Sequence, residues 1–355
     1  MKKLSIVIPA FNVMNYIGRT LQSIFIQNRD DIEVLIINDG SSDETEEVVR
    51  RTIKQFGVNN AELHGKENEG VSVARNDGIA KASGEYVMFL DGDDYLTDGA
   101  VQRIVDVVSI TNSDILHWPY DLVTEAGNVL QKFPYSAYAV GLRGGAQTVA
   151  DIVQQESTKV WTGSAVYRKE FLFKHGIGFV PGCVAGEDIE FILKALFLAE
   201  SVYFSDEIRS CYVQRNLSVM HQYNVRKFDA VLALERINSF FSHQQEGSGT
   251  VFPRFAQSKL VIDSYIGTYR MCLVHLVTGE SLRLMTAKKK LDEDIAANYP
   301  GLSDRMHLMI RKSLREKLVF RFVTFQMSPV IYYYAAKASD ALSKTKQHSD
   351  TAAAR

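Results

Sequence analysis

The chain has 355 residues, of which 46% are hydrophobic and 23% charged, a balance typical of a folded soluble protein with two or three domain-sized units. A formal net charge of −2 argues against a bulk electrostatic attraction to nucleic acid. Three scattered cysteines without CxxC spacing argue against a disulfide framework or a zinc site, so we expect reduced thiols in the cytosol.

The N-terminal segment MKKLSIVIPAFN places two lysines before apolar residues, as a signal peptide does. Its apolar run is short, and Pro9 and Asn12 interrupt it, so we expect a first β-strand instead. No stretch of about 18 or more apolar residues is without charge, and the sequence therefore predicts no transmembrane helix.

Apolar strands alternate with amphipathic helices over the first 118 residues. The predicted strands are Leu4–Pro9, Ile32–Asn38, Ala61–His64, Tyr86–Leu90 and Asp114–Trp118. The predicted helices are Tyr16–Gln27, a helix that ends near Phe56 and that Ser42 or Asp43 can cap, Gly70–Ala82, and Asp98–Ser109. This alternation predicts an α/β fold whose mostly parallel sheet is flanked by helices. Ligands bind such sheets beyond the carboxyl ends of the strands, where Asp39 and Asp91 each follow an apolar strand.

The pattern changes after Trp118. We expect a hairpin over Asp121–Phe133, short helices over Thr148–Glu156 and Lys169–His175, and an apolar helix that begins near Gly186. Beyond about Asn224 the sequence predicts a helical C-terminal region, with a candidate linker at 242–250 and a flexible tail at 344–355.

Three carboxylates follow the strand Tyr86–Leu90 in Asp91-Gly-Asp93-Asp94. Carboxylates on alternate residues can hold a divalent cation whose shell a phosphate completes. The spacing does not fit a calcium loop. A second interpretation stays open, in which these acids cap the helix that starts near Asp98.

Three further groups have one structural and one functional interpretation each. Asp39 can accept hydrogen bonds from a base or a ribose, or can form an Asx-type turn. Arg75 can contact a phosphate, or can hold the acidic turns in place by an ion pair. Glu187 and Asp188 can supply a general base, or can stabilise a helix N-terminus through the helix dipole.

Five segments together resemble the inverting family-2 glycosyltransferases in the order that this family has. They are IVIPAFN at 6–12, VLIINDGSSDET at 34–45, NEGVSVARNDGI at 68–79, YVMFLDGDD at 86–94 and GEDIEF at 186–191. The resemblance covers about residues 3–220 and implies the GT-A fold of nucleotide-diphospho-sugar transferases. It implies a GT-A domain at 1–223, with a nucleotide-binding half at about 1–120 and an acceptor half at about 121–223. The helical region would then be 224–343.

The resemblance also implies roles for individual residues. Asp188 matches the catalytic base, with Glu187 beside it, and Asp93 and Asp91 match the acids that bind Mg²⁺ or Mn²⁺. Arg215 stands where many relatives carry a histidine that can complete the metal shell. An arginine cannot ligate a cation, so we expect Arg215 to pair with the donor diphosphate. The remaining positions implied for nucleotide, donor, sugar or acceptor are Pro9, Phe11, Asn12, Asp39, Arg75, Asp91, Ser218, Trp161 and Gly163.

The expected function is inverting transfer of a sugar from a nucleotide-diphosphate sugar, first of all a UDP-sugar, to a hydroxyl of a glycan or lipid-linked acceptor in surface polysaccharide synthesis. One alternative is an inactive sugar-nucleotide-binding or scaffold protein. Another is a nucleotidyltransferase, but PAFNVMNY after the first strand is not the Gly-rich, basic turn that such an enzyme should carry.

The segment 305–336 combines basic, apolar and aromatic residues. Arg305, Arg311, Lys312, Arg315, Lys317 and Arg321 are interleaved with apolar positions and precede FVTFQMSPVIYYYAA at 322–336. This pattern predicts either a helix in a membrane interface or a helix on the protein's own core with a solvated basic face. We expect a cytoplasmic protein. If the segment lies in a membrane interface, the protein would also attach peripherally to the inner face of the cell membrane.

Overall fold

The computed structural model describes residues 2–27, 29–133, 140–155, 160–215, 222–245, 254–316, 319–330, 332–334 and 336. The chain divides into two compact units, an N-terminal unit of residues 1–216 and 233–251 and a C-terminal unit of residues 217–232 and 252–355. The sequence predicted a boundary at 223/224. In the division by compactness, the chain leaves the first unit near residue 216 and returns to it from residue 233 to residue 251. The predicted domain boundary stays a prediction.

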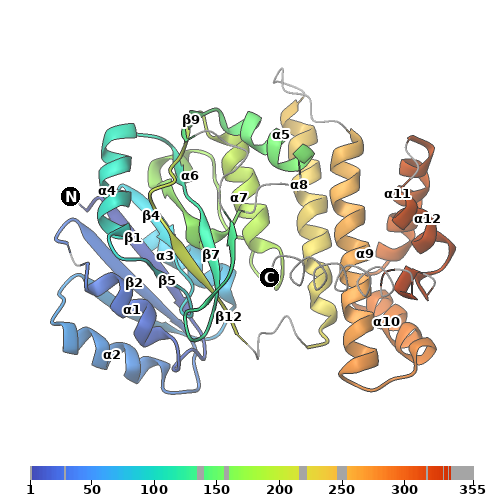
Figure 1. Ribbon diagram of the computed structural model, residues 1–355, viewed down its shortest axis with the longest axis horizontal. Coiled ribbons are helices and arrows are strands. Elements are labelled where there is room, and N and C mark those ends of the chain that lie inside the picture. The colour runs from blue at the N-terminus through green and yellow to red at the C-terminus, as the bar shows by residue number, and fades with distance from the viewer. Residues whose placement is uncertain are drawn as a thin grey trace, which may run out of the picture. The chain divides into compact units, whose positions relative to one another are not determined.

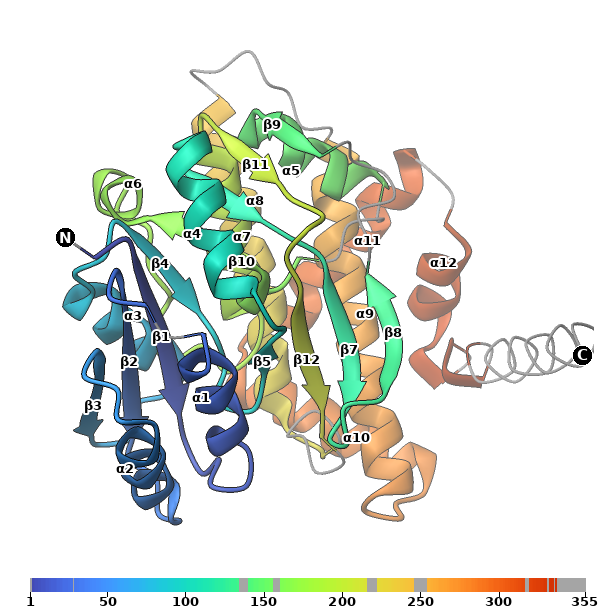
Figure 2. The same cartoon turned by 60° about the vertical axis from the view of Figure 1, so that its left-hand side comes forward.

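A large mixed sheet forms the centre of the N-terminal unit, with the strand order β3-β2-β1-β4-β10-β6-β11-β9. Strands β3, β2, β1 and β4 run parallel and side by side (Figure 2), whereas β10 is antiparallel to both of its neighbours. The strands are β1 Leu4–Ala10, β2 Ile32–Asp39, β3 Ala61–Lys66, β4 Tyr86–Phe89, β6 Ile115–His117, β9 Gly141–Arg143, β10 Ala165–Arg168 and β11 Val202–Phe204.

A smaller sheet with the order β5-β12-β7-β8 belongs to the same unit. Its strands are β5 Tyr95–Leu96, β7 Tyr120–Thr124, β8 Val129–Phe133 and β12 Ser210–Gln214. The hairpin predicted over 121–133 is β7 and β8, which pair antiparallel. Strand β12 lies between β7 and β5 and so carries residues 210–214 alongside the segment that follows Asp94.

Helices cover both faces of the large sheet (Figure 1). Ile6 and Ile8 of β1 belong to a core cluster that includes side chains of α1, α2 and α4. Helix α3 contacts β1 and β2 as well. Each fully buried aliphatic side chain of this kind contributes about 1.5–3 kcal/mol. The helices of this unit are α1 Ile17–Phe25, α2 Thr45–Phe56, α3 Val71–Lys81, α4 Ala100–Thr111, α5 Gly145–Gln155, α6 Lys169–Lys174 and α7 Glu187–Leu198, with a 3₁₀ turn η1 at Thr162–Ser164.

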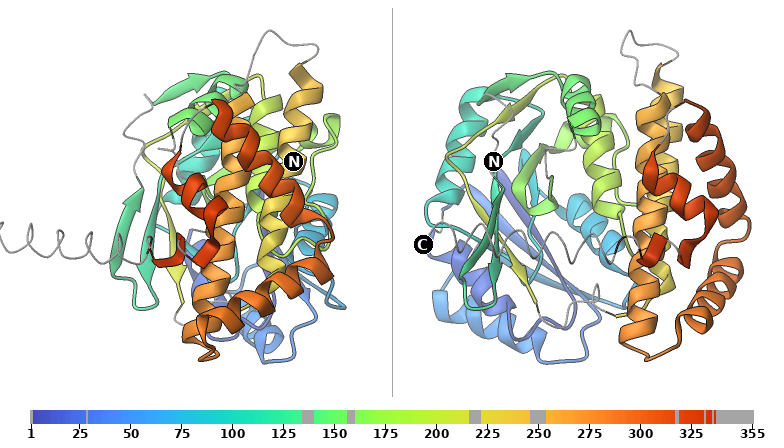
Figure 3. Two further views of the ribbon diagram at one scale, coloured as in Figure 1. Left: turned by 90° about the vertical axis from the view of Figure 1, so that its right-hand side faces the viewer. Right: turned by 45° about the vertical axis from the view of Figure 1, so that its right-hand side comes forward.

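Helix α8 (Asp229–Gln245) contributes residues to both units, and the helices that follow it belong to the C-terminal unit. There α9 packs against α10 and α11, and α12 packs against α11 (Figure 3). The bounds are η3 Val225–Phe228, α9 Arg254–Thr278, α10 Leu284–Asn298, α11 Leu302–Glu316 and α12 Phe320–Met327. In the described residues, 259–278 of α9 are long and apolar enough to cross a membrane. Half of that stretch is buried inside the structure.

The α/β architecture, the sheet flanked by helices and the helical C-terminal region confirm the predicted fold class. The sequence did not predict β10 as an antiparallel strand between β4 and β6, or the pairing of β12 with β7. These pairings join segments far apart in the chain, and periodicity within one segment carries no information about them.

Candidate active site

Arg75 joins two of the predicted acidic segments. Its guanidinium donates to Asp91 Oδ1 at 2.8 Å and to Glu187 Oε1 at 3.1 Å, and its side chain is only 4% exposed. Burial lowers the pKa of Arg75, but the charges of Asp91 and Glu187 outweigh it and the pKa is raised. The arginine from α3 therefore holds the turn after β4 against the start of α7.

Asp93 lies in an ion pair with Arg215, whose Nε is 2.7 Å from Asp93 Oδ2. Burial and then the charge of Asp91 raise the pKa of Asp93 to about 6, although Arg215 opposes the shift. The neighbouring Asp94 is buried and accepts a hydrogen bond from the backbone N–H of Val213 at 2.7 Å. Arg215 contacts a carboxylate here, so its predicted contact with the donor diphosphate stays a prediction.

The interpretation of these acids as caps of the following helix is wrong for the described part of the chain. Helix α4 begins after Gly99, and no side chain caps it. Asp94 instead ties the end of this turn, just before β5, to β12.

Asp39, at the end of β2, fastens the turn before α3. Its carboxylate accepts the backbone N–H groups of Glu69 at 3.0 Å and Gly70 at 2.8 Å, and the side chain is buried. Gly40 has φ +72°, and a Cβ there would lie 2.8 Å from the backbone N of Asn68. These bonds join residues 30 and 31 positions apart, so they are not the local Asx-type turn that was one interpretation of Asp39. The contact of Asp39 with a nucleotide base stays a prediction.

The turn after β1 is held against the turn after β2. Asn12 has φ 52°, and its Oδ1 accepts the backbone N–H of Ser42 at 2.9 Å. Pro9 is buried in β1, whereas Phe11 is 49% exposed. Phe11, one of the positions that the resemblance implies for nucleotide, donor, sugar or acceptor, therefore offers an accessible ring at this turn.

Asp188 occupies the first turn of α7, next to Glu187. It is partly buried, and its Oδ1 accepts the backbone N–H of Ile189 at 2.7 Å. Burial and then the charge of Asp188 raise the pKa of Tyr167, which lies in β10 beneath the site. A carboxyl group that is partly open to solvent can be reached by an acceptor hydroxyl, as a general base must be.

Aromatic side chains lie beside these carboxylates. The ring centroid of Trp161 is 5.2 Å from that of Tyr120 and 5.4 Å from that of Tyr212. Gly163 lies against the indole, because a Cβ there would come within 2.5 Å of the Trp161 ring. Tyr212 is 38% exposed. Its pKa is raised to about 12 by burial and by the charges of Asp94, Asp93, Asp91 and Asp188.

Trp161 and Gly163 were predicted from the sequence, but Tyr120 and Tyr212 were missed. Both tyrosines lie in the small sheet, where β7 and β12 pair in parallel and bring them to the same indole. Their only signal was the aromatic content of two short strands. Ser218 lies outside the described residues.

The carboxylates of this site fit a divalent cation only if the phosphates of a bound substrate supply further ligands. The described residues contain no group of three or more His, Cys, Asp or Glu side chains that could hold a metal. Asp91 and Asp93 lie close enough for one charge to shift the pKa of the other, and Mg²⁺ is commonly bound by one or two carboxylates together with substrate phosphates. Arg215 would have to release Asp93 for that arrangement.

Known proteins resemble this chain in sequence. The model of glycosyl transferase family 2 matches residues 5–173. An uncharacterized glycosyltransferase of Rickettsia bellii is 30% identical over 39% of this chain and 19% of its own length. The uncharacterized glycosyltransferase YibD of Escherichia coli is 29% identical over 61% of this chain and 63% of its own length. The chain thus spans less than two thirds of either relative.

Solved structures resemble the whole chain in fold. The crystal structure of S. aureus TarS 1–349 in complex with UDP-GlcNAc has a TM-score of 0.64 at 16% identity and covers 95% of this chain and 92% of that one. At such low sequence identity, the structural likeness establishes only the fold. The family match, the glycosyltransferase relatives and this likeness agree with the site geometry: residues 5–173 belong to glycosyltransferase family 2, in a chain with the GT-A fold.

Proposed function

We propose that this protein is an inverting glycosyltransferase that moves a sugar from a UDP-sugar to a hydroxyl of a glycan or lipid-linked acceptor in surface polysaccharide synthesis. The observation that carries the proposal is the Arg75 bridge between Asp91 and Glu187. It holds the turn assigned to the donor beside Asp188, the candidate base. The UDP-GlcNAc in the TarS structure supports a donor whose base is uracil.

The reaction is one displacement at the anomeric carbon of the donor. Asp188 accepts the proton of the acceptor hydroxyl as the new oxygen–carbon bond forms. The bond to the diphosphate breaks, and the nucleoside diphosphate leaves from the opposite face with the bonding electron pair. Configuration inverts, so an α-linked donor gives a β-linked product. The acceptor sugar would rest on Tyr212 and Trp161, the aromatic pair beside Asp188.

Asp91 and Asp93 would hold Mg²⁺ or Mn²⁺ together with the donor phosphates. When bound, the cation supplies electrostatic stabilisation of the charge that grows on the leaving diphosphate. Arg215 would move from Asp93 to the diphosphate and add a charge-assisted hydrogen bond.

A donor screen tests the proposal. UDP-, GDP- and dTDP-sugars are incubated with the protein and Mn²⁺, and the release of nucleoside diphosphate is measured. We expect hydrolysis of a UDP-sugar, reduced in the Asp188→Asn variant. Binding of a sugar nucleotide without turnover on any acceptor would favour the scaffold alternative. Synthesis of a nucleotide sugar from a nucleoside triphosphate and a sugar phosphate would favour the nucleotidyltransferase.

Replacing Arg215 by alanine is expected to weaken the binding of UDP more than the binding of uridine, because the guanidinium would contact only the diphosphate. Isothermal titration of both ligands against wild type and Arg215→Ala measures the difference. Arg215→Lys keeps the charge and should lose less.

The ion pair with Asp93 provides a second readout for the same variants. Without nucleotide, Arg215→Ala should bind Mn²⁺ more tightly than wild type, because Asp93 no longer has a competing cation. Asp93→Asn should lose Mn²⁺ binding. Equal losses of UDP and uridine affinity in Arg215→Ala would contradict the diphosphate role.

The second part of the proposal is peripheral membrane attachment through exposed basic residues, without the buried aromatic residues of α12. Phe322 and Phe325 are 0% and 1% exposed, so they pack in the core of the C-terminal unit and cannot lie at a lipid boundary. Arg311, Lys312 and Arg315 of α11 are exposed. Attachment would therefore be mainly electrostatic, and Lys317 lies outside the described residues.

The triple variant Arg311→Gln, Lys312→Gln, Arg315→Gln is expected to shift the protein away from vesicles that contain phosphatidylglycerol. Each basic residue near such a surface contributes about 1 kcal/mol, and the attraction weakens as salt screens it. Vesicle flotation at low and high salt measures the shift. The matched control replaces Arg50, Arg51 and Lys54, three exposed basic residues of α2, by glutamine. Wild type that stays unbound at low salt would exclude the attachment.

A further inference from the structure

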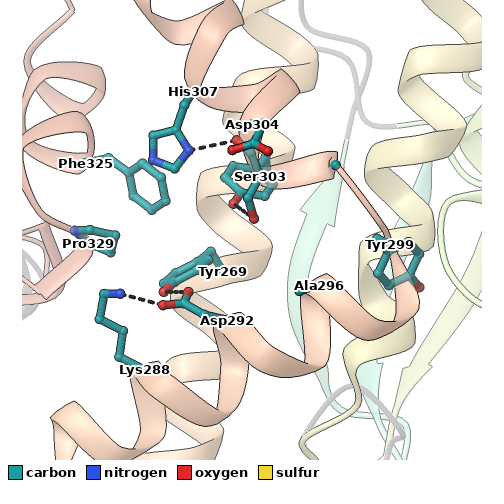
Figure 4. Close-up of a pocket in the computed structure, with 12 residues that line it drawn as sticks. Tyr269, Lys288, Asp292, Ala296, Tyr299, Ser303, Asp304, His307, Phe325 and Pro329 are labelled. Carbon is teal, nitrogen blue, oxygen red and sulfur yellow. Dashed lines mark hydrogen bonds and ion pairs between the residues drawn. The ribbon is translucent and has the colours of Figure 1, made fainter.

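The C-terminal unit contains a cavity of about 390 Å³ between its helices (Figure 4). This volume lies within the range of small-molecule sites, about 300–1,000 Å³. Tyr269 from α9, Asp292 from α10, His307 from α11 and Phe325 from α12 face the cavity from different sides. None of these residues belongs to the transfer site described above.

Aromatic rings form one wall of this cavity, and they are held in place. The ring of Phe325 lies edge-to-face with Tyr265 at 5.8 Å and with Tyr269 at 5.3 Å. The hydroxyl of Tyr265 donates to Ser303 Oγ at 3.2 Å, and that of Tyr269 donates to Asp292 Oδ1 at 2.6 Å. Because each ring is fixed by packing or by its hydroxyl, the wall is formed before any ligand arrives.

Polar groups surround the aromatic wall, and hydrogen-bond acceptors prevail among them. Asp304 is exposed and lines the cavity. His307 Nδ1 lies 2.7 Å from the carbonyl oxygen of Ser303, to which only a protonated nitrogen can donate. In the neutral ring His307 Nε2 is then an acceptor. Lys288, paired with Asp292, contributes a donor.

The charges and contacts of these groups select among ligand classes. Two carboxylates face one lysine, which disfavours phosphates and other anions. Both oxygens of Asp292 already have partners, Tyr269 and Lys288, and the lysine charge opposes an ammonium group. A purely apolar ligand would desolvate Asp304 and His307 Nε2 without giving either one a hydrogen-bond partner. A neutral ligand with many hydroxyls meets none of these penalties.

We propose that this cavity binds a neutral saccharide unit. The hydroxyls would donate to Asp304 and His307 and accept from Lys288, while the C–H groups of the sugar would contact Phe325 and Tyr269. The saccharide's role as a remote sugar of the acceptor glycan rests on the proposed function. The binding itself does not.

Two alanines of α10 allow a matched test. Ala296 and Ala297 are adjacent and both exposed, and of the two only Ala296 is among the residues that line the cavity. Tryptophan at 296 would fill the cavity mouth, whereas tryptophan at 297 makes the same change of size and helix propensity outside it. Neither substitution removes a buried side chain. Far-UV circular dichroism and thermal melting verify that both variants fold.

The probes are glucose, galactose, mannose, N-acetylglucosamine and the anion glycerol 3-phosphate. Saturation-transfer difference NMR and isothermal titration measure their binding without nucleotide. We expect at least one neutral sugar to bind wild type and Ala297→Trp equally. Its affinity should fall at least about tenfold in Ala296→Trp, about 1.4 kcal/mol, and also fall in Asp304→Asn.

Three outcomes would overturn the inference. They are equal sugar binding by the two tryptophan variants, binding of glycerol 3-phosphate in place of neutral sugars, and wild type that binds none of the sugars. UDP titration of the same samples separates this question from the transfer reaction. Loss of sugar binding with UDP binding retained would locate the fault in the cavity proposal, whereas failure to bind UDP would affect the proposed function.

Discussion

Replacing Asp188 by asparagine is expected to reduce sugar transfer by roughly a hundredfold or more, the effect of losing a positioned general base. Asparagine keeps the shape of the side chain and can still interact with the N-terminus of α7. It cannot accept the proton of the acceptor hydroxyl. The measurement is kcat with a saturating donor and a soluble acceptor, together with the Kd of UDP.

The control for this experiment is Asp206→Asn, which makes the same chemical change at an exposed position of the N-terminal unit. Its rate should match that of wild type. In Asp188→Asn the Kd of UDP should stay nearly unchanged, because the carboxylate acts on the acceptor. A parallel loss of UDP affinity and rate would move Asp188 from catalysis to donor binding.

Replacing Arg75 by alanine is expected to lower the free energy of unfolding by about 3 kcal/mol, at the lower end of the range for breaking a buried ion pair. The arginine side chain is 4% exposed, and its removal leaves Asp91 and Glu187 without their shared partner. Asp91 is 29% exposed, and water can offset part of the loss. Urea denaturation of wild type and variant measures the difference.

Arg103 and Glu207 supply the matched control, because their ion pair has side chains that are 57% and 56% exposed. Arg103→Ala should change the free energy of unfolding by less than about 1 kcal/mol. The double variant Arg75→Met, Glu187→Gln should recover part of the stability lost in Arg75→Ala, because it removes one uncompensated charge. If Arg75→Ala is as stable as Arg103→Ala, the bridge does not hold the site together.

Local patterns along the chain were enough to predict the features that depend only on neighbouring residues. Apolar strands that end in Asp39 and Asp91 predicted a sheet with acids at its carboxyl edge, because parallel strands place those ends together. The periodicity of residues 16–27 and 70–82 predicted α1 and α3 for the same local reason. Five short motifs in order were enough to predict the family.

The partners of those residues follow from the long-range packing of the chain. Arg75 bonds Glu187 across 112 positions, and Val213 bonds Asp94 across 119, so no local pattern contains either contact. Arg215 was expected on a phosphate and lies on Asp93, because β12 pairs with β5 and brings residue 215 beside the acidic turn. Phe322 and Phe325 have the pattern of a membrane-facing helix, and only the packing of α12 in the C-terminal unit buries them. A sequence records which side chains are apolar or charged, whereas the surface that each one meets is set by long-range packing.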